Sequence, residues 1–155
     1  MAAYSERLTV SWWIWPLTVA FAVGLAAELT IGAFFLRHWA TFAIAAAIAL
    51  AALLWLGRLR LRVTADALHV DDATLPISAI AAVSAVDAEG RRMLLGPEAE
   101  PMAFVVQRPW IPTGVRVDLD DETDPTPYWY VSSRHPDALV AALHQAGAPL
   151  DAKTE

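Results

Sequence analysis

The chain has 155 residues, a formal net charge of −6 and no cysteine, and 57% of its residues are hydrophobic. The absence of cysteine excludes disulfides, thiolate metal sites and cysteine nucleophiles. From Arg58 onward there are nine basic and fifteen acidic residues, so this part of the chain repels phosphate backbones and we do not expect it to bind nucleic acid.

Residues 12–56 contain two apolar runs and predict a hairpin of two transmembrane helices. The first run starts at Trp12 and carries no charge before Glu28, and the second, Ala40 to Leu56, is uncharged throughout. A helix needs about 20 apolar residues to cross a bilayer. Because indole rings favour the depth of the lipid headgroups, five tryptophans are predicted to lie at the membrane interface, namely Trp12, Trp13, Trp15, Trp39 and Trp55.

The distribution of arginine predicts the orientation of this hairpin. Arg58, Arg60 and Arg62 follow the second run and Arg7 precedes the first, whereas the connecting segment carries only Arg37. By the positive-inside rule, both termini face the cytoplasm of a multi-pass plasma-membrane protein. Arg58, Arg60 and Arg62 are also predicted to lie beside the headgroups.

Glu28 is the ionisable residue that the first apolar run contains. A carboxylate within a span is a functional hypothesis by default, such as a proton relay. Alternatively, Glu28 lies roughly 24 Å along the helix from Trp12, near the far interface, where its carboxylate reaches the headgroups or pairs with Arg37 or His38. Both interpretations stay open.

Residues 57–147 predict a mainly antiparallel β barrel or sandwich that a C-terminal helix closes. Residues 57–64 alternate apolar and polar side chains, which indicates a strand with Leu59, Leu61 and Val63 in the core. Further strands are expected at 67–71, 73–75, 80–87, 103–107, 114–119 and 128–132, with a turn at 88–90 and one helical turn at 91–95. Pro136 and Gly147 bound the predicted helix. Residues 1–11 are expected to form a cytoplasmic segment and residues 148–155 a flexible tail.

Several motifs carry a resemblance. Residues 4–8 (YSERL), 54–60 (LWLGRLR), 95–97 (LGP), 104–110 (FVVQRPW) and 124–129 (DPTPYW) together resemble domain of unknown function family 3093. The resemblance implies a small, mainly actinobacterial membrane protein without an assigned activity. Residues 130–139 are also similar to the last strand and helix of bacterial pleckstrin-homology-like (PH-like) domains, which implies a fold but no function.

Two motifs with acidic residues are candidates for metal or catalytic sites. His69 and Asp71 share one face of a predicted strand, as a metal site or acid/base pair requires, but an exposed polar pair on an edge strand has the same pattern. The run from Asp118 to Asp124 lacks the glycine and the glutamate that a calcium loop needs, since Thr123 and Trp129 occupy those positions. We therefore predict no catalytic residue, no metal site and no cofactor.

The loop that starts at Arg108 is the candidate for partner binding. Its two prolines stiffen a segment that carries Arg108 and Trp110, residue types common at interface hot spots, and Trp129 is expected nearby. The alternative is an aromatic plug at one end of the barrel.

The sequence predicts a membrane-anchored interaction or scaffold module without catalysis, which binds a protein partner or a second copy of itself and no small-molecule substrate. One alternative is a domain that senses anionic lipid through Arg58, Arg60 and Arg62. The other is an accessory subunit of a transporter or membrane enzyme, in which Glu28 takes part.

Overall fold

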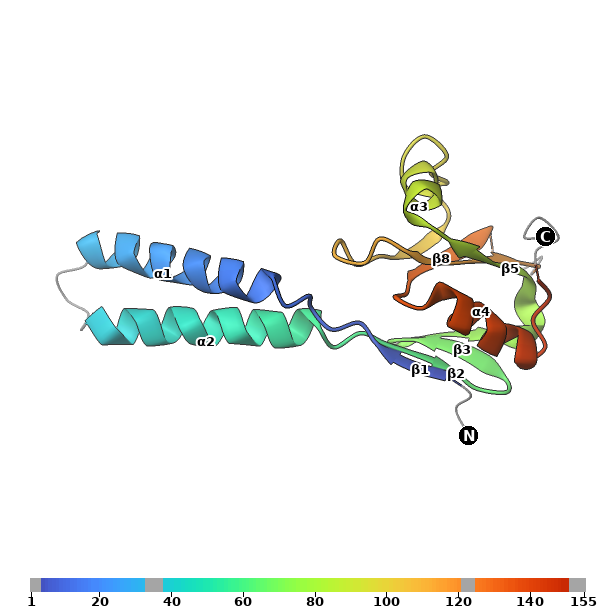
Figure 1. Cartoon of the computed structure of the whole chain (residues 1–155), viewed down its shortest axis with the longest axis horizontal. Helices are drawn as coiled ribbons and strands as arrows, with labels where there is room; N and C mark the ends of the chain where they lie inside the picture. The colour runs from blue at the N-terminus through green and yellow to red at the C-terminus, as the bar shows by residue number, and fades with distance from the viewer. Residues whose placement is uncertain (1–3, 33–37, 121–124, 151–155) are drawn as a thin grey trace. The chain divides into compact units, whose positions relative to one another are not determined.

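The structure is a computed structural model of the chain, and it describes residues 4–32, 38–120 and 125–150. The chain divides into two units (Figure 1). The helical unit is Thr9–Arg58, and the sandwich domain consists of Met1–Leu8 together with Leu59–Glu155. Of the predicted N-terminal segment 1–11, the described residues 4–8 thus group with the domain.

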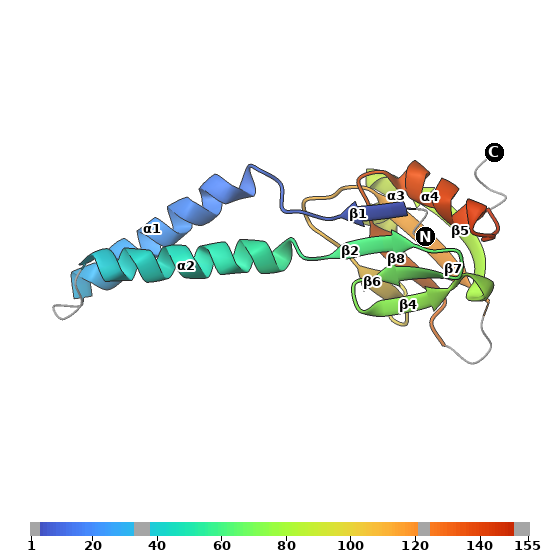
Figure 2. The same cartoon turned by 90° about the horizontal axis from the view of Figure 1, so that it is seen from below.

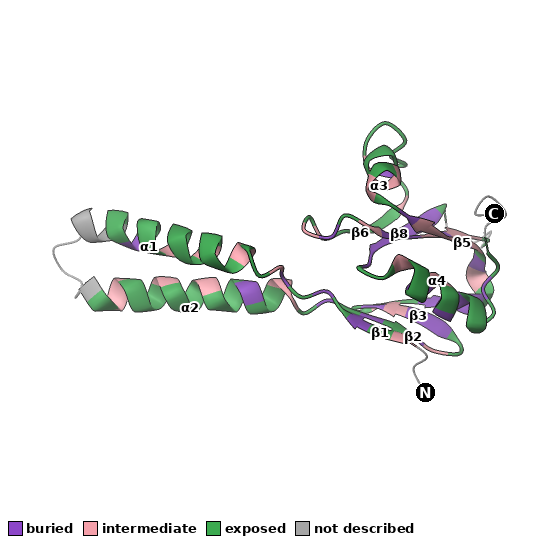
Figure 3. Ribbon diagram, viewed as in Figure 1, coloured by how far each residue is buried: buried purple, intermediate pink, exposed green. Residues whose placement is uncertain are grey.

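The helical unit contains α1 (Ile14–Gly32) and α2 (His38–Leu56), which pack side by side. Most of their described residues are exposed (Figure 3), whereas Ala26 and Leu53 are buried. A helix that is apolar on all sides and unburied is typical of a membrane span. Among the described residues, one helix, Trp39–Leu56, is long and apolar enough to cross a bilayer, whereas the apolar part of α1, Ile14–Glu28, is shorter. The second crossing stays a prediction.

The first sheet of the sandwich domain has the order β1-β2-β3-β4 and is antiparallel throughout (Figure 2). Its strands are β1 (Tyr4–Arg7), β2 (Arg60–Val63), β3 (Ala67–Val70) and β4 (Ala73–Pro76). In β2 the two arginines are exposed and the two apolar residues are buried, as their alternation predicts. Strand β1 was not predicted.

The second sheet has the order β5-β7-β8-β6. Its strands are β5 (Ile80–Val86), β6 (Phe104–Val106), β7 (Gly114–Leu119) and β8 (Tyr128–Ser132), and a short 3-10 helix, η1 (Ile77–Ala79), precedes β5. Strand β6 pairs with β8 in parallel, and the other pairs are antiparallel. The chain passes through α3 (Ala88–Leu94) between β5 and β6, so that β6 runs in the same direction as β8 and pairs with it in parallel.

Helix α3 corrects the turn that was predicted at residues 88–90. The carboxylate of Asp87 accepts hydrogen bonds from the N–H groups of Glu89 (3.1 Å) and Gly90 (2.8 Å). An aspartate in this position satisfies the free N–H groups of a first helical turn. Gly90 therefore lies inside a helix that begins three residues earlier than the predicted helical turn.

Helix α4 (Pro136–Gln145) ends in a glycine cap. Gly147 has a φ of 107°, its N–H donates to the carbonyl of His144 (2.9 Å), and the Ala148 N–H donates to the carbonyl of Leu143 (3.0 Å). This is the Schellman arrangement, which uses glycine because a side chain is strained at positive φ. The Val83 N–H also donates to the carbonyl of Pro149 (3.0 Å), so residues 148–150 belong to the fold; the rest of the predicted tail, 151–155, lies outside the described residues.

The core of the domain lies between the two sheets and under α4. It contains Leu61, Val63 and Leu68 from the first sheet, Val83, Val115, Val117 and Val131 from the second, and Leu139 and Leu143 from α4. A smaller cluster, Val86, Leu94, Tyr128 and Tyr130, lies where α3 covers the outer face of the second sheet. The predicted sandwich closed by a C-terminal helix is confirmed.

Candidate functional site

The helical unit is inserted into the chain between two strands that pair with each other. Strands β1 and β2 align Tyr4 with Val63 and Arg7 with Arg60. The ladder continues beyond the strands, because the Leu8 N–H donates to the carbonyl of Leu59 (3.1 Å). The sandwich domain therefore holds the chain close together at the two points where it leaves for the helices and returns from them.

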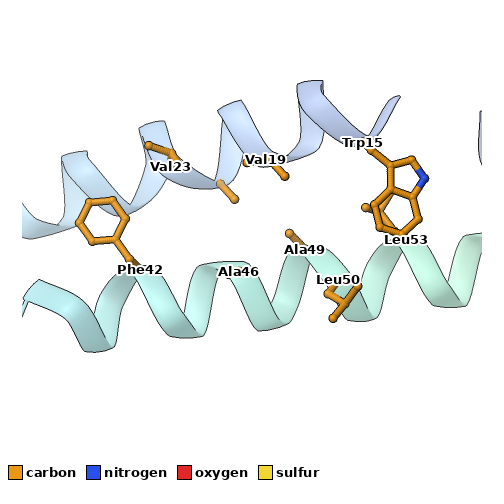
Figure 4. A pocket seen from close by; sticks show the side chains of 9 residues that line it. Trp15, Val19, Val23, Phe42, Ala46, Ala49, Leu50 and Leu53 are labelled. Atoms are coloured by element: carbon orange, nitrogen blue, oxygen red, sulfur yellow. The ribbon is translucent and has the colours of Figure 1, made fainter. Parts of the chain in front are cut away.

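The five predicted interfacial tryptophans are all exposed. Trp12, Trp13 and Trp15 lie at the start of α1, and Trp39 and Trp55 lie near the two ends of α2. Trp15 also borders a cavity of about 260 Å³ between the helices, together with Val19, Phe42 and Leu53 (Figure 4). The lining is apolar apart from the indole N–H of Trp15. Glu28 is exposed, and its predicted partners Arg37 and His38 lie outside the residues whose side chains are described.

The outer face of the first sheet carries three arginines. Arg7 and Arg60 stand directly opposite each other on β1 and β2, and Arg62 stands opposite Ser5 on one side and His69 on the other. None of the three guanidinium groups forms an ion pair with a described residue. We call this surface the arginine face and define it by Arg7, Arg60, Arg62 and His69. Arg58, in contrast, belongs to the helical unit.

On the opposite face of β1, the buried carboxylate of Glu6 joins the N-terminal strand to the start of α4. It accepts hydrogen bonds from the Ser133 hydroxyl (2.6 Å), the Tyr4 hydroxyl (2.9 Å) and the Arg134 backbone N–H (2.9 Å). The His135 Nδ1 lies 3.8 Å from the same carboxylate. Burial, and then the hydrogen bond to Glu6, raise the pKa of Tyr4 to about 12. We call these residues the Glu6 cluster.

The Glu6 cluster is built to hold two segments together. Ser133 is fully buried, and its backbone forms two hydrogen bonds with Thr113. The Ser133 N–H donates to the Thr113 carbonyl (3.1 Å), and the Ser133 carbonyl accepts from the Thr113 hydroxyl (2.7 Å). Because its hydroxyl donates to the carboxylate and has no access to solvent, it cannot meet a substrate as a nucleophile. Buried polar networks in which every member is satisfied specify one packing arrangement. Sequence reasoning missed this cluster, since Glu6 and Ser133 lie 127 positions apart.

The predicted partner-binding residues divide into two groups. Trp129 is buried, and its ring packs on that of Phe104 with centroids 4.3 Å apart. It contributes to the core and not to a surface that a partner can contact. Arg108 and Trp110 are half-buried, with the guanidinium 6.0 Å from the indole centroid, and the Arg108 N–H donates to the Ser132 hydroxyl (3.0 Å). The role of Arg108 and Trp110 in partner binding stays a prediction. The loop also closes the core, as the alternative of an aromatic plug expects, because Ile111 is fully buried.

His69 and Asp71 do not converge on a common point. The His69 Nδ1 lies 3.1 Å from the Thr74 hydroxyl on the neighbouring strand, and Asp71 sits in the β3–β4 turn with a φ of 54°. Within the described ranges, no three histidine, aspartate or glutamate side chains are grouped to hold a metal ion.

A broad cleft of about 620 Å³ lies on the outer face of the second sheet, between α3 and the start of α4. Arg116 lines it, with its guanidinium 4.3 Å above the Tyr128 ring and paired to Asp118 (2.6 Å). Beneath α3, the fully buried Tyr130 ring packs over Gly114, and burial raises its pKa while the nearby charge of Arg91 opposes that rise. Among the described residues that line the cleft, the basic one is Arg116, and it already has a carboxylate partner.

These features define a class of protein: an apolar helical hairpin inserted between the first two strands of a β sandwich that a C-terminal helix closes. More particularly, the chain belongs to the family described as protein of unknown function (DUF3093), whose model matches residues 3–143. No curated protein and no solved structure matches the chain. The matched residues include both units, so the inserted hairpin is part of the region that the family model describes.

Proposed function

We propose that the protein is a plasma-membrane anchor that crosses the bilayer twice and carries a cytoplasmic interaction domain without catalysis. The observation that carries the proposal is the pairing of β1 with β2. Strands of one sheet lie on one side of a membrane, so the chain between them must cross an even number of times. If α2 crosses the bilayer, α1 must therefore cross it as well, in the opposite direction, although α1 contains Glu28.

Helix length supports the same arrangement. Both α1 and α2 contain 19 residues and extend about 28 Å, close to the hydrocarbon thickness of about 30 Å. Glu28 lies one turn before the end of α1, where a carboxylate can reach the headgroups. Arginine is concentrated beside the strands, at Arg7, Arg58, Arg60 and Arg62, which favours a cytoplasmic domain and cytoplasmic termini.

The interaction role of the domain rests on its exposed side chains. Arg108 and Trp110 keep part of their surface accessible. Val105, on the edge strand β6, and Met102, shortly before that strand, are exposed apolar residues. The partner is a protein or a second copy of the chain. We also propose a PH-like fold, which is supported by two packed, mainly antiparallel sheets followed by a helix.

Cysteine labelling tests the membrane arrangement directly, because the native chain has no cysteine. Single cysteines at Arg37 and at the exposed Ala99 are compared in intact cells with an impermeant maleimide. We expect labelling at position 37 and none at position 99 until the membrane is opened. Labelling at position 99 in intact cells, or release of the protein by alkaline carbonate, would overturn the proposal.

The interaction role is tested by crosslinking in native membranes followed by purification. We expect one defined partner, or the chain itself, to be captured, and capture to fall in the R108A/W110A variant but not in an E98A control. Glu98 is exposed in the loop after α3. A monomeric particle with no crosslinked species would contradict the proposed interaction.

A further inference from the structure

The arginine face concentrates positive charge in an acidic protein. Arg7 and Arg60 are direct cross-strand neighbours, and Arg62 follows two residues after Arg60 on the same face of β2. Like charges directly opposite each other destabilise a strand pair. The fold therefore carries an internal repulsion that a bound anion would relieve.

Most of the described acidic residues of the domain are located elsewhere. Asp87, Glu89, Glu98 and Glu100 lie at α3 and the loop that follows it, on the other sheet of the sandwich. Three acidic residues lie in the turns of the first sheet, Asp66 between β2 and β3 and Asp71 and Asp72 between β3 and β4, and none of them forms an ion pair with a described residue. The charged residues at the strand positions of the arginine face are thus all basic, although the chain as a whole is at −6.

In the described part of the sandwich domain, no helix covers this face. Helix α4 packs on the other side of the first sheet, where Leu139 and Leu143 contact the core, and Figure 2 shows β1, β2 and β4 in front of the second sheet. Ser5, Arg7, Arg60 and Arg62 are all exposed. The face is a flat, solvated surface and not a pocket.

The covalent structure limits how far this face can lie from the membrane. Arg60 begins β2 four residues after Leu56, the last residue of α2, a connection of about 14 Å at most. A bilayer surface that carries anionic lipid attracts basic residues within about a Debye length, which is roughly 8–10 Å at physiological salt.

From these observations we infer that the arginine face binds the anionic phospholipid headgroups of the bilayer that holds the hairpin. The inference rests on the proposed membrane anchoring. Each arginine near an anionic surface contributes about a fivefold preference, so Arg7, Arg60 and Arg62 together favour the bound orientation roughly a hundredfold.

The test uses the full chain in lipid nanodiscs with a fluorophore on a single cysteine at Ser5, which lies between the arginines. Quenching by spin-labelled headgroups is compared between phosphatidylcholine discs and discs that also contain phosphatidylserine. We expect strong quenching only with phosphatidylserine, and its loss at high salt. A fluorophore at Ala99 is the positional control, since it lies in the loop after α3 and is expected to show no lipid dependence.

Two matched variants separate charge from folding. R7Q/R60Q/R62Q should lose the phosphatidylserine response, whereas R7K/R60K/R62K should keep it, because headgroup attraction needs the charge and not the guanidinium. Circular dichroism should remain unchanged for both variants, since the three side chains are exposed and form no ion pair with a described residue. A lipid response that survives in the glutamine variant overturns the inference.

The remaining outcomes are also decisive. Equal quenching in the two kinds of disc refutes the arginine face as a lipid-binding surface but leaves the anchoring intact. A change caused by inorganic phosphate in phosphatidylcholine discs would assign the face to a soluble anion instead. A chain that does not enter the discs refutes the anchoring, and the inference with it.

Discussion

Removing the Glu6 carboxylate is expected to release the N-terminal strand from the sandwich domain. In the Glu6→Ala variant the Ser133 hydroxyl and the Arg134 N–H lose their acceptor, whereas the partly exposed Tyr4 hydroxyl can turn to water. Each buried donor left unsatisfied costs about 1–3 kcal/mol. The fully buried Ser133 hydroxyl, with a smaller contribution from the partly buried Arg134 N–H, predicts a loss of about 3 kcal/mol, which corresponds to roughly a hundredfold change in an opening equilibrium.

Hydrogen exchange of the full chain in detergent measures this loss where it is expected. The Leu8 N–H, bonded to the carbonyl of Leu59, and the Ser133 N–H, bonded to that of Thr113, report on the two segments that Glu6 joins. Both should exchange about a hundred times faster in the variant. Amides in the central strand β7 should change less, because the damage is local to β1 and the β8–α4 connection.

Two variants define the comparison. Glu6→Gln keeps the shape and one acceptor oxygen of the side chain but turns an NH2 group toward the donors. Its loss of stability should therefore be about half that of Glu6→Ala. Glu98→Ala, at an exposed position, should leave exchange unchanged. If the Leu8 and Ser133 amides of Glu6→Ala exchange within about threefold of the native rates, the Glu6 cluster does not hold β1 in place and the reasoning is wrong.

Three further predictions concern the sandwich domain. Gly147→Ala should lower its stability by about 1 kcal/mol, because φ is 107° there and the nearest side-chain atom, at 3.9 Å, leaves room for a methyl group; an unchanged unfolding midpoint would contradict the cap. Gly114→Ala should lower the stability of the domain by more than this, because a Cβ would lie 2.6 Å from the carbonyl oxygen of Val131. Normal expression with native thermal stability would instead show that β7 and β8 can move apart to accept the methyl group. Tyr4, with its pKa raised to about 12, stays protonated in the folded chain when an unfolded tyrosine has ionised. The stability that its protonated form contributes is therefore present below pH 10 and lost as the pH rises toward 12, so absorbance at alkaline pH should show one late-titrating tyrosine fewer in Tyr4→Phe.

The sequence predicted correctly those helices and strands that are determined by residues close together in the chain. Strand β2 follows from the alternation of Arg60, Leu61, Arg62 and Val63, and α4 follows from its proline start and glycine end. Helix α3 had the same kind of signal in Asp87 followed by Glu89, but Gly90 made the segment resemble a turn. These elements needed no knowledge of distant residues.

Elements defined by distant partners could not be predicted in this way. Strand β1 has four residues, and its partner β2 begins more than fifty positions later. Trp129 was expected at a surface, yet β8 lies between β7 and β6 with all five of its residues buried, because α3 and the core cover opposite faces. A segment buried on both sides shows no polar alternation, and its exposure cannot be deduced from its own sequence.

The position of the hairpin between β1 and β2 also sets an order of events during synthesis. Strand β1 leaves the ribosome first, but its neighbour β2 emerges only after both helices, and the residues that bind Glu6 emerge more than seventy positions later still. The N-terminal strand therefore stays unpaired until both helices have been synthesised. In the proposed membrane arrangement, a chain that crossed the bilayer only once would separate β1 from β2, so completion of the first sheet would depend on correct insertion. The unpaired edge of β2 would then distinguish a misinserted chain from a correctly inserted one.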